Sequence, residues 1–61
     1  MKMLRVKVID GEEIYVNPHH IVFLRKGMDN GTKIIIEGTT VINSVDSLAV
    51  VLLDLERLNY D

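Results

Sequence analysis

Turn signals recur along the first two thirds of this chain, and they limit the folds that it can adopt. Glycine occurs in Asp10-Gly11 and in Asp29-Asn30-Gly31, Gly38 stands alone, and the only proline is in Asn17-Pro18. Glycine adopts a positive φ at little steric cost, and proline has no N–H to donate to a neighbouring strand. Each site therefore predicts a reversal or an interruption between short extended segments.

The segments between these turns have the composition of β-strands. In residues 4–8 and 13–16, apolar and polar side chains alternate, which is the pattern of a half-buried strand. Residues 21–24 are all apolar, which indicates a strand covered on both faces. Residues 32–37 are strongly β-prone, and residues 39–43 form one more short segment.

A helix is predicted for the last segment, from Val45 to about Leu58. Ser44 is a suitable N-cap because its hydroxyl can accept a hydrogen bond from a backbone N–H two or three residues later. Asp46 would lie in the first turn, where the helix dipole favours negative charge. The predicted fold is α+β: a small antiparallel β-meander of about five strands with one C-terminal helix, in a single domain over residues 1–61.

The small size of the chain predicts that it associates with other subunits. A domain of 61 residues buries only about 60% of the surface that its unfolded chain exposes. The sequence has no cysteine and only two histidines, so it supplies neither disulfides nor the ligands of a structural zinc site. We therefore expect no metal and no cofactor, and we expect a homo-oligomer.

The predicted helix carries more apolar side chains than one sheet face requires. The stripe expected to cover the sheet is formed by Leu48, Ala49, Leu52, Leu55 and Asn59, widened by Val45 and Leu53. Val50, Val51 and Leu58 lie outside this stripe, and we expect them in an oligomer interface.

The other face of the predicted sheet is also apolar. Its members are Ile9, Tyr15, Ile35 and one alternate pair of residues 21–24. An uncovered apolar face usually marks an interface. The alternative is a curled sheet that buries both faces within one chain.

Basic side chains gather on or beside the predicted strands, whereas acidic side chains gather in turns and on the helix. The candidates for binding a small anionic ligand are Arg5, Lys7, Arg25 and Lys33. The alternative is that they are ordinary solvated strand residues, since lysine on a strand also deters edge-to-edge pairing.

The sequence contains no recognisable catalytic motif, so we expect no enzyme activity. Ser44 and Ser47 are not in a nucleophile elbow, and the glycines do not form a phosphate loop. His19 and His20 are adjacent in sequence, which favours solvated loop residues over a shared metal site. The formal net charge of −2 disfavours binding to nucleic acid.

The location is expected to be the cytoplasm of a bacterium or of a phage-infected host. The N-terminus lacks the apolar region of a signal peptide. The longest apolar run, from Leu48 to Leu53, is far shorter than a membrane span, so no membrane insertion is expected.

Turn glycines and alternating apolar residues together form a pattern that covers nearly the whole chain. The residues that carry it are Asp10-Gly11, Val16-Asn17, Ile21, Leu24, Gly31-Thr32, Ile34, Ile36, Gly38 and Ser44-Val45. This pattern resembles the small flagellar FlbD/SwrD family. The resemblance implies a cytoplasmic accessory protein of motility, without catalytic residues.

From these observations we expect a non-enzymatic, homo-oligomeric binding or adaptor protein with a protein partner, associated with motility. The alternative is a phage-type inhibitor or ligand-sequestering protein. Such a protein would bind a nucleotide or another anionic ligand at a subunit interface.

Overall fold

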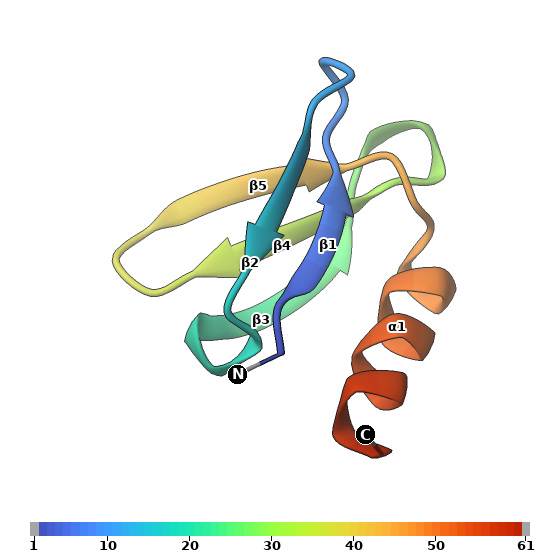
Figure 1. Cartoon of the computed structure of the whole chain (residues 1–61). Helices are drawn as coiled ribbons and strands as arrows, with labels where there is room; N and C mark the ends of the chain where they lie inside the picture. Colours follow the sequence, from blue (N-terminus) through green and yellow to red (C-terminus); the bar gives the residue numbers. More distant parts are fainter. Residues whose placement is uncertain (1, 61) are drawn as a thin grey trace.

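The structure, a computed structural model, describes residues 2–60, with side chains up to residue 58. The elements in chain order are β1 (Leu4–Lys7), β2 (Glu13–Val16), the short 3-10 helix η1 (Pro18–His20), β3 (Ile21–Lys26), the 3-10 helix η2 (Met28–Asn30), β4 (Thr32–Ile36), β5 (Thr40–Ser44) and α1 (Leu48–Tyr60). Figure 1 shows the strands with α1 beside them. The predicted α+β fold of about five antiparallel strands and one C-terminal helix is confirmed. Neither α1 nor the two short helices of the described region is long and apolar enough to span a bilayer.

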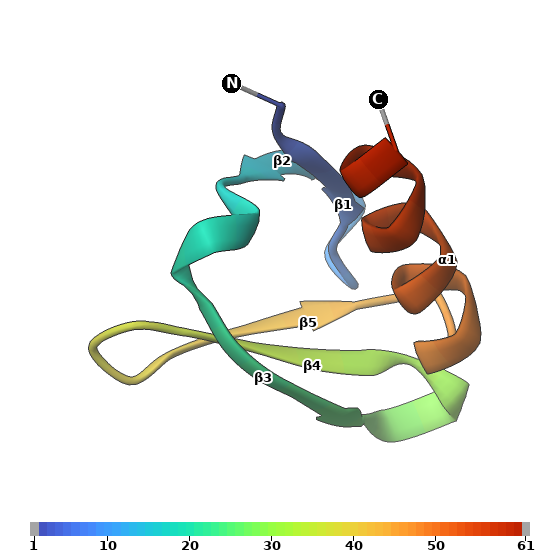
Figure 2. The same ribbon diagram turned by 90° about the horizontal axis from the view of Figure 1, so that it is seen from below.

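The strands form two sheets, and a short backbone contact joins them. β1 pairs with β2, whereas β3, β4 and β5 form a meander. Val8, just beyond β1, pairs with Ser44 at the end of β5, and the Val45 N–H donates to the Lys7 carbonyl oxygen at 2.9 Å. The strand order is therefore β2-β1-β5-β4-β3. In Figure 2 the β1–β2 hairpin lies across from the β3–β5 sheet, and α1 closes one side of the space between them.

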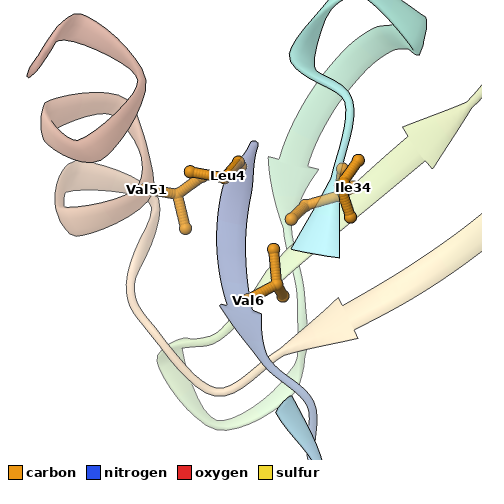
Figure 3. Close-up of a cluster of buried hydrophobic side chains, with 5 residues drawn as sticks. Leu4, Val6, Ile34 and Val51 are labelled. Carbon is orange, nitrogen blue, oxygen red and sulfur yellow. The ribbon is translucent and has the colours of Figure 1, made fainter. Parts of the chain in front are cut away.

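The core lies between the hairpin, the three-stranded sheet and the helix. Its buried apolar side chains are Leu4, Val6, Val16, Ile34 and Val51. In Figure 3, Val51 of α1 points toward Leu4 of β1, and Ile34 of β4 belongs to the same buried cluster. The alternation predicted for β1 places Leu4 and Val6 in the core, and Arg5 and Lys7 therefore face outward.

The helix begins later than predicted, and its N-cap is Ser47, not Ser44. The Ser47 hydroxyl accepts a hydrogen bond from the Val50 N–H at 3.4 Å. Ser44 is instead the last residue of β5, and its hydroxyl accepts from the Asp46 N–H at 3.1 Å. The prediction was wrong because Ser44 still belongs to β5 and the Val45 N–H bonds to Lys7 of β1, so Asp46 precedes the helix.

The face of the helix that meets the core also differs from the predicted one. Val51 is only 4% exposed, and Leu55 and Leu58 pack beside it at the i, i+4 and i+7 positions of one helix face. By contrast, Leu52 is 51% exposed and Ala49 is also exposed, so the stripe predicted to cover the sheet is wrong at these positions. The side chain of Asn59, the last member of that stripe, lies outside the described residues.

A β-bulge in β3 exposes two neighbouring apolar side chains. Ile21 pairs with Ile36 and Phe23 pairs with Ile35, so Val22 is an extra residue without a counterpart on β4. Ile21 and Leu24 pack against the core, whereas Val22 and Phe23 are 58% and 50% exposed. The exposed pair is therefore not the alternate pair that was predicted.

The turn between β3 and β4 packs closely against the end of β5. A Cβ atom at residue 31 would lie 2.4 Å from the Ser44 carbonyl oxygen, so only glycine fits there. The Gly31 N–H donates to the Met28 carbonyl oxygen, and the Gly27 N–H donates to the Gly31 carbonyl oxygen, each at 2.9 Å. These bonds hold η2 next to the junction of the two sheets.

Replacement of Gly31 by alanine is expected to lower the free energy of unfolding by about 1–3 kcal/mol, because the added methyl group must displace the backbone of Ser44. Urea denaturation measures this loss. Gly27→Ala is the matched control, since its Cβ would approach neighbouring atoms no closer than 3.4 Å. An equal loss in both variants would contradict the close approach to Ser44.

The orientation of the helix is tested by removing methyl groups from adjacent positions. Val51→Ala is expected to lower the free energy of unfolding by about 1.5–3 kcal/mol, because Val51 is buried in the core. Leu52→Ala in dilute solution is expected to change it by no more than about 0.5 kcal/mol, because half of this side chain is already in water. The reverse order of the two losses would show that the originally predicted helix face covers the sheet.

Candidate functional site

The four basic residues predicted to bind an anion fall into two separate pairs. Arg5 and Lys7 alternate along β1 and face away from the core. Arg25 and Lys33 lie opposite each other on β3 and β4. The two pairs line different hollows, so the structure does not bring the four predicted residues into one patch.

The first hollow lies between β1 and α1, and we call it the β1–α1 groove. It is lined by Met3, Leu4, Arg5, Lys7, Asp46, Asp54, Arg57 and Leu58 and has a volume of about 420 Å³. Its charged side chains include two carboxylates besides the cations, so it is not a purely cationic site. The Arg5 guanidinium also lies 3.6 Å from the Glu13 carboxylate, and both side chains are well exposed. Such an exposed pair stabilises the fold by less than about 1 kcal/mol.

Hydrogen bonds with two buried hydroxyl groups, one a donor and one an acceptor, fix the end of the β1–α1 groove at Asp46. The Thr32 hydroxyl donates to the Asp46 carbonyl oxygen at 2.9 Å, while the Asp46 N–H donates to the Ser44 hydroxyl oxygen. Thr32 and Ser44 are 1% and 2% exposed. Because both polar groups of the Asp46 backbone are held, the segment between β5 and α1 has a defined path past β1.

The second hollow lies on the outside of the three-stranded sheet, and we call it the outer-sheet hollow. It is lined by Phe23, Arg25, Lys33, Ile35, Thr39 and Val41 and has a volume of about 430 Å³. Phe23 and Val41 are each 50% exposed. The apolar character predicted for this sheet face is present, and the curling of the sheet does not bury it.

The outer side of α1 is a third exposed surface, which we call the α1 outer face. It is formed by Ala49, Val50, Leu52 and Leu53. The last three are 42%, 51% and 46% exposed. Val50 was predicted to be on this outward side, whereas Leu52 and Leu53 were not. Their exposure follows from the docking of α1, which turns Val51 to the core. Choosing Ser47 instead of Ser44 as the cap would have shortened the predicted helix at its start without changing the predicted face.

Val51 and Leu58, the other residues predicted to form an oligomer interface, face inward in this fold. Val51 belongs to the core, and Leu58 is half-buried against it and also lines the β1–α1 groove. Their predicted position on the free side of the helix is therefore wrong. The physical reason is the docking of α1, in which Val51 joins Leu4 of β1 in one buried cluster, a contact that helical periodicity alone does not specify.

The adjacent histidines serve the local structure around η1. The Asn17 side chain accepts a hydrogen bond from the His19 N–H at 3.0 Å, so Asn17 caps η1. The His20 Nδ1 atom lies 3.0 Å from a Glu37 carboxylate oxygen at an exposed position. Within residues 2–60, no group of three or more His, Asp or Glu side chains is placed to hold a metal ion.

Thr32→Val is expected to lower the free energy of unfolding by about 1–3 kcal/mol, because it leaves the partly buried carbonyl group of Asp46 without its donor. Thermal or urea denaturation measures the loss. Thr40→Val is the matched control, since the Thr40 side chain is exposed. If both variants are equally stable, Thr32 does not hold the segment that leads into α1.

Comparisons of the chain with protein-family models, with curated proteins and with solved structures find no match. The resemblance to the FlbD/SwrD family therefore stays a prediction, based on turn residues and alternating apolar residues. The surfaces described above are the basis for a functional assignment.

Proposed function

We propose that this protein is a non-enzymatic adaptor that associates with copies of itself through the α1 outer face. The observation that carries this proposal is the exposure of Val50, Leu52 and Leu53 on a helix whose opposite side already covers the core. A helix that packs on one sheet needs only one apolar side. The second apolar side of α1 is explained by contact with another subunit.

Association through the α1 outer face would remove from water apolar side chains that the single chain leaves exposed. Complete burial of a leucine side chain contributes about 1.5–3 kcal/mol to the free energy of association. Leu52 and Leu53 would each contribute less, because about half of each side chain is already buried in the single chain.

The outer-sheet hollow is a second apolar surface, which a protein partner can contact while the α1 outer face binds another copy of the chain. The outer-sheet hollow lies on β3, β4 and β5 and shares no residue with the α1 outer face. One chain could therefore contact a copy of itself on the helix and a different protein on the sheet. Separate contacts of this kind suit an adaptor, and the FlbD/SwrD resemblance supports a cytoplasmic role in motility for it.

Sequestration of a nucleotide or another anion receives less support. The predicted cationic residues are divided between two hollows, and the β1–α1 groove contains Asp46 and Asp54 beside its cations. Carboxylates so close to a phosphate would repel it. The arrangement therefore favours an adaptor over a protein that captures small anions.

The replacement of Leu52 and Leu53 together by aspartate is expected to convert an oligomer into a monomer, because both charges would face the apolar surface of the second copy. Size exclusion with light scattering measures the mass. Tyr15→Asp is the control, since Tyr15 is 64% exposed on β2 and is not part of the α1 outer face. A wild-type chain that is monomeric at high micromolar concentration would contradict the proposal.

Nucleotides and inorganic pyrophosphate are expected to leave the melting temperature of the protein unchanged. A ligand that binds only the folded state raises the melting temperature, so a thermal-shift screen detects such binding directly. A rise that disappears in Arg5→Ala or in Arg25→Ala would favour the anion-sequestering alternative instead. The variant that abolished the rise would also identify the hollow concerned.

A further inference from the structure

The edge of β1 that faces α1 has unpaired backbone groups. Along β1, the even-numbered residues direct their N–H and C=O groups toward β2, since the Val8 N–H donates to the Glu12 carbonyl oxygen. The odd-numbered residues direct theirs to the other side, where Lys7 and Ile9 bond to the end of β5. The N–H and C=O groups of Arg5 therefore point away from β2, to the side where β5 has already ended.

These backbone groups open into the β1–α1 groove. Beyond Val45 the chain leaves β1 and turns into α1, so within the described residues no strand continues β5 alongside Arg5. Residues 3–5 and Lys7 line one wall of the groove, and Asp54, Arg57 and Leu58 of α1 line the other. A strand edge beside a helix is a geometry in which domains bind an extended peptide as an added strand. The groove volume of about 420 Å³ lies within the range of roughly 300–1,000 Å³ typical of binding pockets.

We propose that the β1–α1 groove binds an extended peptide segment of a partner protein, which pairs with β1 at Arg5 and continues the line of β5. This assignment rests on the proposed adaptor function and specifies how one partner is held. Since β5 runs antiparallel to β1 at Val8 and Ser44, a segment that continues β5 is antiparallel to β1 as well. Its backbone would donate to the Arg5 carbonyl oxygen and accept from the Arg5 N–H.

The side chains that line the groove specify the composition of the peptide. The residue opposite Arg5 has its side chain on the outer face, next to Arg5 and Lys7 on the β1 wall of the groove, whereas Asp54 lies on the α1 wall and Asp46 at one end. An acidic side chain is therefore favoured on the β1 side of the groove. The two neighbours of this peptide residue point to the inner side, toward Leu4 and Leu58. The occupant is therefore a segment in which apolar and acidic residues alternate. A free anion fits less well, because it cannot satisfy a donor and an acceptor of the backbone at the same time.

Amide hydrogen exchange of the ¹⁵N-labelled protein tests the proposal in two stages. Without peptide, the Arg5 amide should exchange faster than the Val6 amide, which bonds to β2. The probe is a blocked heptapeptide in which valine alternates with glutamate. At saturation it should slow exchange of the Arg5 amide by about tenfold or more, because the amide gains a hydrogen bond. The same peptide with N-methylated glutamates should not bind, because it lacks the donors.

Charge variants then test the side-chain part of the proposal. Lys7→Glu should weaken binding of the valine–glutamate peptide by about threefold or more, through repulsion across the strands. Lys26→Glu is the control, since Lys26 lies at the end of β3 and outside the groove, and it should leave the affinity unchanged. A companion peptide with lysine in place of glutamate should bind the wild-type protein more weakly.

Three results would overturn the proposal. The first is slow hydrogen exchange of the Arg5 amide without peptide, and the second is an exchange rate of this amide that the valine–glutamate peptide does not change at about 1 mM. The third is a change of amide exchange at Lys7 and Arg57 with pyrophosphate but not with the peptide. The mass of the protein is measured in the same samples. An oligomer that does not bind the peptide would refute the groove assignment alone. A monomer that binds it would refute self-association and leave the groove assignment intact.

Discussion

The contact between the end of β1 and the end of β5 determines most of the architecture. It consists of the Val8–Ser44 pair and the hydrogen bonds from the Val45 and Ile9 amides to the facing strand. Without it, the β1–β2 hairpin and the three-stranded sheet would be separate, and two-stranded hairpins are only marginally stable in water. Two neighbouring residues support this contact. Gly31 lets the β3–β4 turn approach the Ser44 carbonyl oxygen closely, and the Thr32 hydroxyl bonds to the Asp46 carbonyl oxygen in the segment after β5. The core of five buried apolar side chains forms in the space that this contact encloses.

The same contact fixes the orientation of the helix and thereby the surfaces available to partners. Because the Val45 N–H is bonded to Lys7 of β1 and the Asp46 backbone is held by Thr32 and Ser44, α1 begins at Leu48, and Val51 faces the core. Val50, Leu52 and Leu53 are then left on the outside. The departure of the chain from β1 also leaves the backbone of Arg5 facing the β1–α1 groove. A surface for self-association and an open strand edge are thus two consequences of one local constraint.

Much of the fold could be predicted from the sequence because turns and alternation are local signals. The turns at Gly11, Gly31 and Gly38 and the alternation in β1 placed the strands within a residue or two of their observed bounds. The helix face could not be predicted in this way. Ser44 and Ser47 are both suitable caps, and the choice between them depends on pairing of Ser44 with a strand more than thirty residues away. The bulge at Val22 could not be predicted from local sequence either, because it is defined by the pairing of β3 with β4. The basic residues were identified as exposed strand residues, but their division into two hollows depends on how the sheet curls.

The most direct test of self-association through α1 is an isotope-filtered nuclear Overhauser experiment on a mixture of ¹³C-labelled and unlabelled chains. Such an experiment detects only contacts between different subunits. We expect intermolecular signals from the methyl groups of Val50, Leu52 and Leu53, and none from Val51, which is enclosed within its own subunit. Intermolecular signals confined to Phe23 and Val41 of the outer-sheet hollow, or the absence of any such signal at high micromolar concentration, would contradict an interface formed by the outer face of the helix.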